Sequence, residues 1–189
     1  MKIKVFKDFA IHWTDIKNLE DIILSGTILE GSAFSDNPDF GIHSPNLWNT
    51  GLVFRKIDIK PYITLEEIVK KKYDIISKRD RYPLWLVEVA EKEPDTPFWK
   101  WEREIRILKD VSLSKLKLIV YRKKGRYVRK RDIENILKKF KLPFIPILEI
   151  DKFVLSLPEF EFEEVEVGEV PINAIISIMK RRIYRKLEL

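Results

Sequence analysis

The sequence contains no cysteine and only two histidines, His12 and His43, among its 189 residues. The absence of cysteine excludes disulfide bonds, cysteine-ligated zinc or iron–sulfur centres and a thiol nucleophile. Two histidines are too few for a histidine-rich metal site, so we expect no structural metal. No apolar run approaches the ~20 residues that cross a bilayer, and the N-terminal residues lack the apolar core of a signal peptide. We therefore expect a cytoplasmic protein without a membrane partner.

Apolar and charged residues are both abundant, at 45% and 35% of the chain. This composition can build a core, and the length predicts a single domain over residues 1–189, with a C-terminal lobe from about residue 151 as the alternative. The 36 lysines and arginines exceed the 30 acidic residues, so the protein is basic with a net charge of +6. Richness in lysine, glutamate and isoleucine is typical of a thermophile.

Patterns of apolar residues predict several strands with inserted helices. Thr64 and Glu67 have the spacing of a helix-capping box, and Gly26 is suited to end a helix that begins at Thr14 or Asp15. The predicted class is therefore α+β, with a mixed or mostly antiparallel sheet and a few helices. Strands are expected at residues 2–6, 9–14, 51–59, 82–90, 99–108, 116–121, 145–150, 153–157 and 160–167, helices at 15–24, 64–78 and 132–140, a helical turn at 171–174 and a strand or helix at 175–184.

His12 and Thr14 are the first candidate site residues, because they stand at the end of a predicted strand directly before a helix. An imidazole and a hydroxyl in such a crevice could hold a ribose or an amide. The alternative is a half-buried histidine bonded to a backbone carbonyl, with Thr14 acting only as a helix cap.

Glu102 and Glu104 form the second candidate. A period of two would place both carboxylates on one face of a strand, about 7 Å apart, where burial would raise one pKa. Arg106 continues this row and could bind a phosphate or a carboxylate. The alternative is a solvated sheet face with ion pairs between strands.

Two further segments are candidates for ligand contacts. The long loop from Phe34 to Trp48 combines polar and aromatic side chains, as ligand-binding loops do, although its aromatic residues could equally fill the core. The run YRKKGRYVRKR from Tyr121 to Arg131 interleaves cations with tyrosines, which suits phosphates and stacked bases, although a charged thermophile surface looks the same. The candidate nucleic-acid contacts in that run are Arg122, Lys123, Lys124, Arg126, Arg129, Lys130 and Arg131.

The order of residues in a Mg²⁺-dependent nuclease of the PD-(D/E)xK type is loosely matched by Asp95, Glu104 and Arg106. Such enzymes need hard oxygen ligands and a nearby lysine. Arginine in the lysine position is a departure, because a guanidinium keeps its proton. A metal-dependent nuclease is thus an alternative function, beside a non-catalytic nucleic-acid-binding protein.

The opening segment His12-Trp13-Thr14-Asp15-x-x-Asn18-Leu19-x-x-Ile22-Ile23-x-x-Gly26 resembles the first motif of ADP-ribosyltransferase-like proteins. It is particularly similar to the opening of the DarT-like DNA ADP-ribosyltransferases. The segment His43-Ser44-Pro45-Asn46-Leu47 is similar to the R-S-P-M-L loop of that group, with His43 in place of arginine. Glu104 could stand where the family keeps its catalytic glutamate, although Glu163 or Glu164 competes for this place.

This resemblance implies an enzyme that uses NAD as a substrate and transfers ADP-ribose, with DNA or RNA as the acceptor in a toxin or defence role. Glu104 would stabilise the oxocarbenium-like ribose, assisted by Glu102, and basic residues 122–131 would attract the polyanion. The resemblance gives no prediction of the oligomeric state. The residues expected to hold NAD are His12, Trp13, Thr14, Ser44, Asn46 and Trp48, with Trp13 or Trp48 stacked on the nicotinamide.

Overall fold

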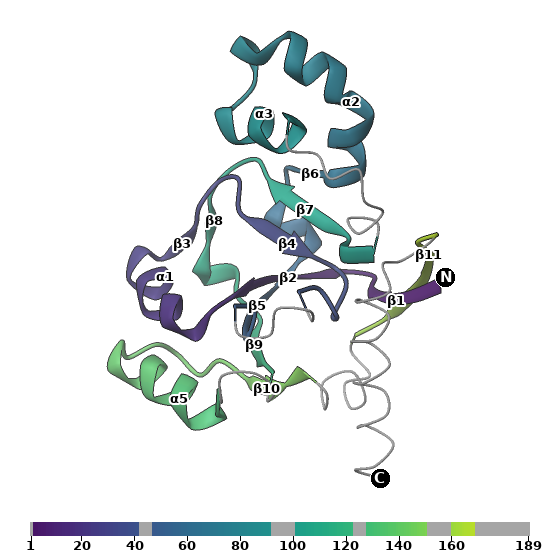
Figure 1. The fold of residues 1–189 in the computed structure, drawn as a ribbon. Helices are drawn as coiled ribbons and strands as arrows, with labels where there is room; N and C mark the ends of the chain where they lie inside the picture. Colours follow the sequence, from purple (N-terminus) through teal and green to yellow (C-terminus); the bar gives the residue numbers. More distant parts are fainter. Residues whose placement is uncertain (1, 42–46, 92–100, 123–127, 151–159, 169–189) are drawn as a thin grey trace.

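The computed structural model describes residues 2–41, 47–91, 101–122, 128–150 and 160–168 (Figure 1). Seven described strands form one sheet in the order β10-β9-β5-β2-β4-β7-β6, in which β10 and β9 are parallel and the other neighbours are antiparallel. The strands of this sheet are β2 (Phe9–Thr14), β4 (Ala33–Ser35), β5 (Thr50–Arg55), β6 (Tyr62–Thr64), β7 (Glu104–Ile107), β9 (Leu118–Tyr121) and β10 (Ile147–Glu149).

Two smaller sheets and several helices surround this sheet, so the predicted α+β class is confirmed. One small sheet pairs β1 (Lys2–Phe6) with β11 (Phe162–Glu166), and the other pairs β3 (Thr27–Ile28) with β8 (Val111–Ser112). The α-helices are α1 (Leu19–Ser25), α2 (Leu65–Ser77), α3 (Leu84–Glu91) and α5 (Lys130–Lys139), and the short 3-10 helices are η1 (Ile16–Asn18), η2 (Lys56–Ile59), η3 (Arg79–Arg81) and η4 (Leu113–Lys115).

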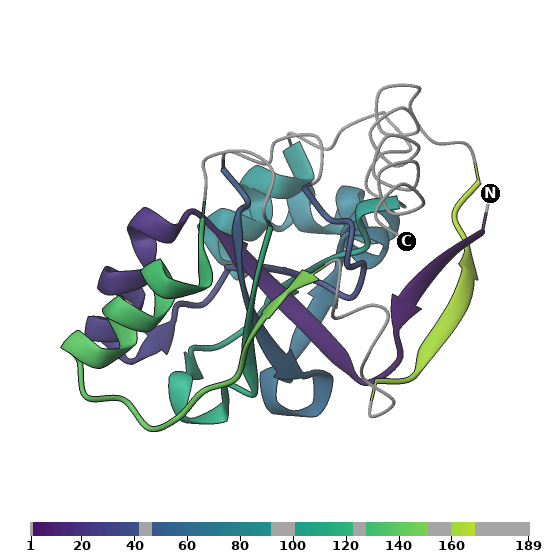
Figure 2. The same cartoon turned by 90° about the horizontal axis from the view of Figure 1, so that it is seen from below.

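The largest core cluster lies between one face of the sheet and the helices α1 and α5. Figure 2 shows these two helices side by side, and an exposed ion pair between Lys139 and Glu20 joins them at 2.7 Å. Every second residue of each strand points towards this cluster, because successive side chains of a strand lie on opposite faces of the sheet. Its members include Ala10, Phe34, Leu52, Phe54, Ile105, Ile107 and Ile119 from the sheet, Leu19 from α1, and Ile133 and Leu137 from α5.

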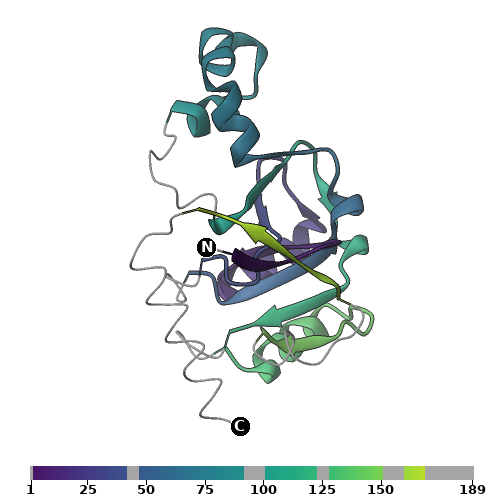
Figure 3. The ribbon, with the colours of Figure 1, turned by 90° about the vertical axis from the view of Figure 1, so that its right-hand side faces the viewer.

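A second cluster fills the opposite face of the sheet. The strand residues here are the intervening ones, such as Ile11, Trp13, Val53 and Val120. The β1–β11 pair crosses in front of the main sheet in Figure 3, and aromatic residues near it, including Phe6, close this cluster. The sheet therefore has two packed faces.

The helices α2 and α3 pack against each other beyond the β6 edge of the sheet (Figures 1 and 3). The prediction of a strand at residues 82–90 is wrong, because this segment contains α3. Its buried residues Leu86, Val87 and Ala90 have helical spacing and contact the apolar side of α2. A short continuous apolar run does not distinguish a buried strand from a buried helix, so the packing against α2 decides between the two.

The prediction of one strand over residues 99–108 is also wrong in its first part. Trp101 and Glu102 are helical, Arg103 has a positive φ of 55°, and β7 begins only at Glu104. The expected strand over residues 51–59 ends at Arg55 and continues as η2, and β4 overlaps the start of the segment predicted as a loop.

Several local predictions are confirmed. Gly26 ends α1 with a φ of 68°, and Thr64 and Glu67 form the capping box of α2. The helix expected from Asp132 begins two residues earlier, and the Asp132 carboxylate accepts the backbone N–H of Arg129 at 3.0 Å. The elements predicted at 153–157, 171–174 and 175–184 lie outside the described residues, and the division into one domain or a domain with a lobe stays a prediction.

We predict that Gly51→Ala destabilises the protein. A Cβ atom at Gly51 would lie 2.6 Å from Cγ2 of Ile11 and 2.7 Å from Cγ2 of Val120. Overpacking of this kind costs about 1–3 kcal/mol in the free energy of unfolding. Urea unfolding measures the loss, and Lys71→Ala on the exposed side of α2 is the control. An unfolding free energy equal to that of the wild type would contradict the packing at β5.

Candidate functional site

A row of polar side chains crosses four adjacent strands at one end of the sheet. Thr14 of β2 pairs with Thr50 of β5, Thr50 pairs with Tyr121 of β9, and Tyr121 pairs with Glu149 of β10. Directly paired residues project from the same face of a sheet, so the four side chains form one line. With strands about 4.8 Å apart, this line is about 14 Å long. We call these four residues the polar row.

His12 lies on the same face as Thr14, two residues earlier in β2. Its ring is 5.3 Å from the ring of Phe34, and its Nδ1 lies 2.8 Å from the carbonyl oxygen of Ala33. Because a carbonyl only accepts, Nδ1 donates the hydrogen and Nε2 of the neutral ring is an acceptor. Burial lowers the pKa of His12, the hydrogen bond to Ala33 opposes this, and the charge of Arg106 lowers the pKa further.

Tyr121 and Glu149 are paired neighbours on β9 and β10 at the other end of the polar row. Burial raises the pKa of Tyr121, and the charge of Glu149 and the hydrogen bond to its carboxylate raise this pKa further. The tyrosine therefore stays protonated and neutral beside the carboxylate. Both side chains are partly buried. The row thus ends in a carboxylate that lies beside a neutral phenol.

Asn49, which is fully buried, holds together the segments that meet at this end of the sheet. Its side-chain Oδ1 accepts the backbone N–H of Ile16 at 2.8 Å, and its Nδ2 donates to the carboxylate of Asp15 at 3.2 Å. Its backbone N–H donates to the carbonyl of Thr14, and its carbonyl accepts from the N–H of Arg122. Asn49 therefore connects the end of β2, the start of η1 and the end of β9 through its side chain and its backbone.

Trp13 and Arg122 fill the opposite face of the sheet beside the polar row. The guanidinium carbon of Arg122 lies 3.7 Å from the centre of the Trp13 ring, and both side chains are almost fully buried. Arg122 also donates to the backbone carbonyls of Trp48, Pro38 and Phe40. These positions do not suit the predicted stacking of Trp13 on nicotinamide or a phosphate contact by Arg122, because both groups already bind one another. Trp48 is half-buried against Phe40, so it takes part in the core.

Glu104 lies elsewhere, beside a cavity of about 310 Å³ at the β6–β7 edge. Burial raises its pKa, and the nearby Arg106, with which it forms an ion pair, opposes this shift. Arg106 also donates to the carbonyl of Gly31 at 2.9 Å. The described residues that line the cavity are Asp36, Lys56, Tyr62, Thr64, Leu65, Glu66, Arg103, Glu104, Ile105, Glu166, Val167 and Gly168.

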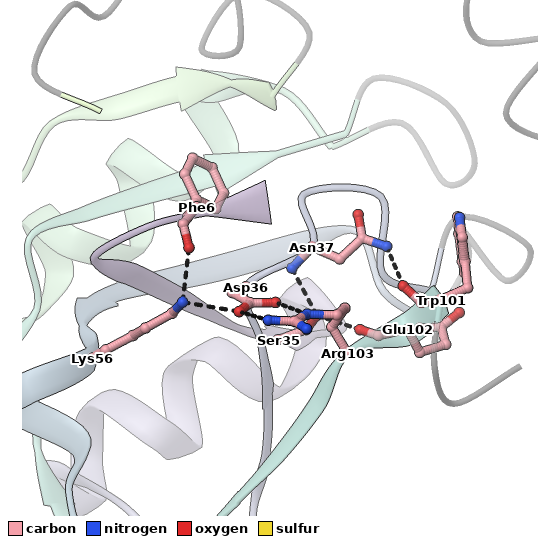
Figure 4. Close-up of polar contacts among 8 residues, drawn as sticks. All are labelled: Phe6, Ser35, Asp36, Asn37, Lys56, Trp101, Glu102 and Arg103. Atoms are coloured by element: carbon pink, nitrogen blue, oxygen red, sulfur yellow. Dashed lines mark hydrogen bonds and ion pairs between the residues drawn. The ribbon is translucent and has the colours of Figure 1, made fainter. Parts of the chain in front are cut away.

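A network of ion pairs next to this cavity is shown in Figure 4. The buried carboxylate of Asp36 accepts two hydrogen bonds from Arg103, at 3.0 and 2.9 Å, and one from Lys56 at 2.9 Å. Both cations that line the cavity are therefore already bound to a carboxylate. Glu102 is buried close by, and its carboxylate accepts the backbone N–H of Gly41 at 2.9 Å.

Glu102 and Glu104 therefore do not share one strand face, which corrects the sequence-based expectation. The left-handed backbone of Arg103 separates them, and their carboxylates bind different groups. The strand β4 lies between β2, which carries His12, and β7, which carries Glu104. His12 is not among the described residues that line the cavity beside Glu104, although the charge of Arg106 affects the pKa of both.

Several predicted site residues lie outside the described residues: Ser44 and Asn46 of the loop, Lys123, Lys124 and Arg126 of the basic run, and Asp95 of the nuclease hypothesis. Arg129, Lys130 and Arg131 are exposed at the start of α5. Within the described residues there is no group of three or more histidines, cysteines, aspartates or glutamates that could hold a metal ion. Likewise, no helix in that part of the chain is long and apolar enough to span a membrane.

Sequence reasoning missed Tyr121 and Glu149 as a pair. In the sequence, Tyr121 stands out only as part of the basic run, and Glu149 is a single acid in an apolar strand segment. A lone acid at the end of a buried strand is a signal that could have drawn attention to Glu149. Its partner could not be found, because the pairing of β10 with β9 joins residues far apart in the sequence.

No protein-family model matches the chain, and no curated protein matches it. Among solved structures, the chain is similar to DarT from Thermus sp. 2.9 in complex with NAD⁺, with 14% identity and a TM-score of 0.45. The match covers 75% of this chain and 94% of that chain. The same protein in complex with carba-NAD⁺ gives 14% identity, a TM-score of 0.44 and coverage of 75% and 95%. DarT belongs to the group that the opening motif resembles.

We predict that Asn49→Ala lowers the unfolding free energy by about 1–3 kcal/mol, because the buried N–H of Ile16 loses its acceptor. Asn49→Asp is the matched variant: it keeps an acceptor for Ile16 but places a second carboxylate against Asp15. Both variants should be less stable than the wild type in urea unfolding. Wild-type stability in both would contradict the role of Asn49.

We predict that His12 makes the protein less stable in mild acid. Its pKa in the folded state lies below the ordinary value of 6.5, so the unfolded chain binds the proton more readily. The stabilisation is present above pH 6.5 and is lost as the pH falls below that value. The midpoint of urea unfolding should decrease as the pH is lowered from 7.5 to 5.5, and the midpoint of the His12→Asn variant should decrease less. Equal pH dependence in the two proteins would contradict a buried neutral imidazole.

Proposed function

We propose that the protein is an NAD-dependent ADP-ribosyltransferase whose NAD site lies at the polar row. The observation that carries this proposal is the alignment of Thr14, Thr50, Tyr121 and Glu149 across four strands, with His12 on the same face. The resemblance of the opening motif to ADP-ribosyltransferase-like proteins supports it, because that motif is the segment that forms the β2 end of the row.

The length and chemistry of the polar row fit a dinucleotide. A row of about 14 Å is too long for a single small group, whereas a dinucleotide carries hydroxyl and amide groups over such a span. His12 offers Nε2 as an acceptor for a ribose hydroxyl, because Nδ1 is bound to Ala33. The amide of Asn18 donates to the hydroxyl of Thr14 at 3.2 Å, and the fully buried Thr50 donates its hydroxyl to Oδ1 of Asn49 at 3.0 Å, so the two threonines fix this end of the row.

Glu149 takes the carboxylate role in this proposal. NAD would supply an ADP-ribosyl group whose bond to the nicotinamide nitrogen breaks with the electron pair leaving on nicotinamide. The positive charge that develops on the ribose is stabilised by a nearby carboxylate. Tyr121 is paired with Glu149 and stays protonated, so the carboxylate has a neutral donor group beside it.

The other glutamates considered in the sequence suit this role less well. Glu104 forms an ion pair with Arg106, which compensates its charge. Glu163 and Glu164 lie on β11, which pairs with β1 outside the main sheet. Glu104 nevertheless remains the residue that the sequence predicts, so the experiment includes it.

The proposal also includes the acceptor, which is a nucleic acid. The protein would act in the cytoplasm in a toxin or defence role. The net charge of +6 favours a polyanion, and the exposed cations Arg129, Lys130 and Arg131 lie at the start of α5. The chain reaches this helix directly after β9, which carries Tyr121. An acceptor held at the start of α5 would therefore lie on the side of the sheet that carries the polar row.

Nicotinamide release from NAD, with and without DNA or RNA, tests the proposal. We expect Glu149→Gln to reduce the rate by about 100- to 1000-fold, because a preorganised charge is lost. Glu104→Gln is expected to reduce it less than about tenfold, as an indirect effect. Glu88→Gln, an exposed change on α3, is the matched control.

A wild-type protein that releases no nicotinamide under any of these conditions would overturn the transferase. A large loss in Glu104→Gln with full activity in Glu149→Gln would instead place the carboxylate on β7. Circular dichroism of each variant excludes misfolding as the cause of a loss.

A further inference from the structure

The strand β4 lies between β2 and β7 (Figure 1), but it is held to these two neighbours unequally. Its register with β2 gives one pair, Ile11 with Ser35, whereas all three residues of β4 pair with β7. Because paired residues share the hydrogen bonds of a backbone ladder, β4 is joined more extensively to β7 than to β2. The place of the β4 backbone in the sheet is therefore set mainly by β7.

The carbonyl of Ala33 in β4 orients His12. It accepts the hydrogen of Nδ1 at 2.8 Å, so a side chain of β2 bonds here to the backbone of β4. A neutral imidazole carries one N–H, and this bond therefore leaves Nε2 as the acceptor. If the carbonyl moved away, Nδ1 would no longer be the preferred position of the proton. The role of His12 thus depends on where β4 places Ala33.

Arg106 holds this part of β4 to β7. Its backbone pairs with Ala33, and its side chain donates from Nη1 to the carbonyl of Gly31 at 2.9 Å. The neighbouring Ile107 adds two backbone bonds: it accepts from the N–H of Gly31 at 2.9 Å and donates to the carbonyl of Ser32 at 3.3 Å. Arg106 therefore reaches the residues on both sides of Ser32, through its backbone and through its guanidinium.

The guanidinium of Arg106 is fixed from its other side by the ion pair with Glu104. The side chain of Arg106 is 27% exposed and that of Glu104 is 15% exposed, so solvent screens these charges only in part. Burial lowers the pKa of His12, and the charge of Arg106 lowers it further. Arg106 thus acts on the imidazole both through β4 and through its charge.

We propose that Arg106 is a positioning residue for His12, because it holds the Ala33 carbonyl at Nδ1 and so keeps Nε2 of the ring available as an acceptor. This inference rests on the proposed function in one respect, namely that Nε2 accepts a ribose hydroxyl of NAD. It also gives Glu104 a role other than the one that the sequence predicts, since its carboxylate holds the guanidinium of Arg106. A change at Arg106 is therefore expected to alter the ring of His12, which lies on a strand that does not pair with β7.

Nitrogen NMR of the imidazole rings tests this inference without NAD. The chain has two histidines, so protein labelled with ¹⁵N-histidine gives two sets of ring signals, and His43→Asn assigns them. At pH 7.5 we expect the His12 ring of the wild type to carry its proton on Nδ1. In Arg106→Gln we expect signals of both tautomers, because the guanidinium no longer holds Gly31 and the Ala33 carbonyl loses its fixed place.

Arg106→Lys separates the charge of Arg106 from its hydrogen bonds. A lysine keeps the charge but does not bind Gly31 and Glu104 together with a planar fork. We expect the tautomers of His12 to be mixed in both variants. The titration midpoint of His12 should rise in Arg106→Gln, where the nearby positive charge is lost, and stay near that of the wild type in Arg106→Lys.

Arg55→Gln is the matched control, because it removes an arginine from an ion pair with Asp58 at the opposite end of β5 from the polar row. It should leave the His12 signals as they are in the wild type. The inference is overturned if the wild-type ring carries its proton on Nε2, or if a folded Arg106→Gln shows the wild-type tautomer. Should Arg106→Gln not fold, as judged by circular dichroism, the tautomer in Arg106→Lys decides in the same way.

NAD binding by the same proteins separates the inference from the proposed function. Loss of one hydrogen-bond acceptor weakens binding by about 2- to 12-fold, so the KM for NAD in Arg106→Gln should rise in this range while kcat changes less. A mixed tautomer in that variant, together with a wild type that neither binds NAD nor releases nicotinamide, keeps the positioning role and overturns the transferase. Nicotinamide release with an unchanged tautomer keeps the transferase and overturns the positioning role.

Discussion

The hydrogen bonds of Asn49 determine how the end of the sheet is assembled. A single buried amide bonds to Asp15 and Ile16 at the start of η1, while its backbone bonds to the ends of β2 and β9. Without these bonds, buried donors would lose their acceptors, which is costly in a low-dielectric interior. Thr50 of the polar row follows Asn49 directly and pairs with Thr14, so the alignment of the row depends on this contact.

The two faces of the sheet differ in what they leave for function. Beside the polar row, the face that carries Trp13 is filled by the guanidinium of Arg122, and a Cβ atom at Gly51 would not fit between Trp13 and Val120. The other face carries His12, the two threonines, Tyr121 and Glu149, and it is bordered by α5. Both faces are packed along most of the sheet, but at this end the hydrogen-bonding groups are concentrated on the face that α5 borders.

Local features of the sequence were predictable, but their spatial partners were not. The opening motif correctly indicated β2, the following helix and the αL end at Gly26, because these depend on neighbouring residues. The alternation around Glu102 and Glu104 was misleading, since the positive φ of Arg103 breaks the strand there. Glu149 could not be predicted as a candidate, because its place beside Tyr121 depends on parallel pairing with β9, which no local pattern encodes.

A crystal structure with a non-hydrolysable NAD analogue tests the central claim most directly. The account predicts that the dinucleotide lies along the polar row, with a ribose hydroxyl at Nε2 of His12 and the nicotinamide ribose beside Glu149. An analogue bound in the cavity beside Glu104, with the polar row unchanged, would contradict it.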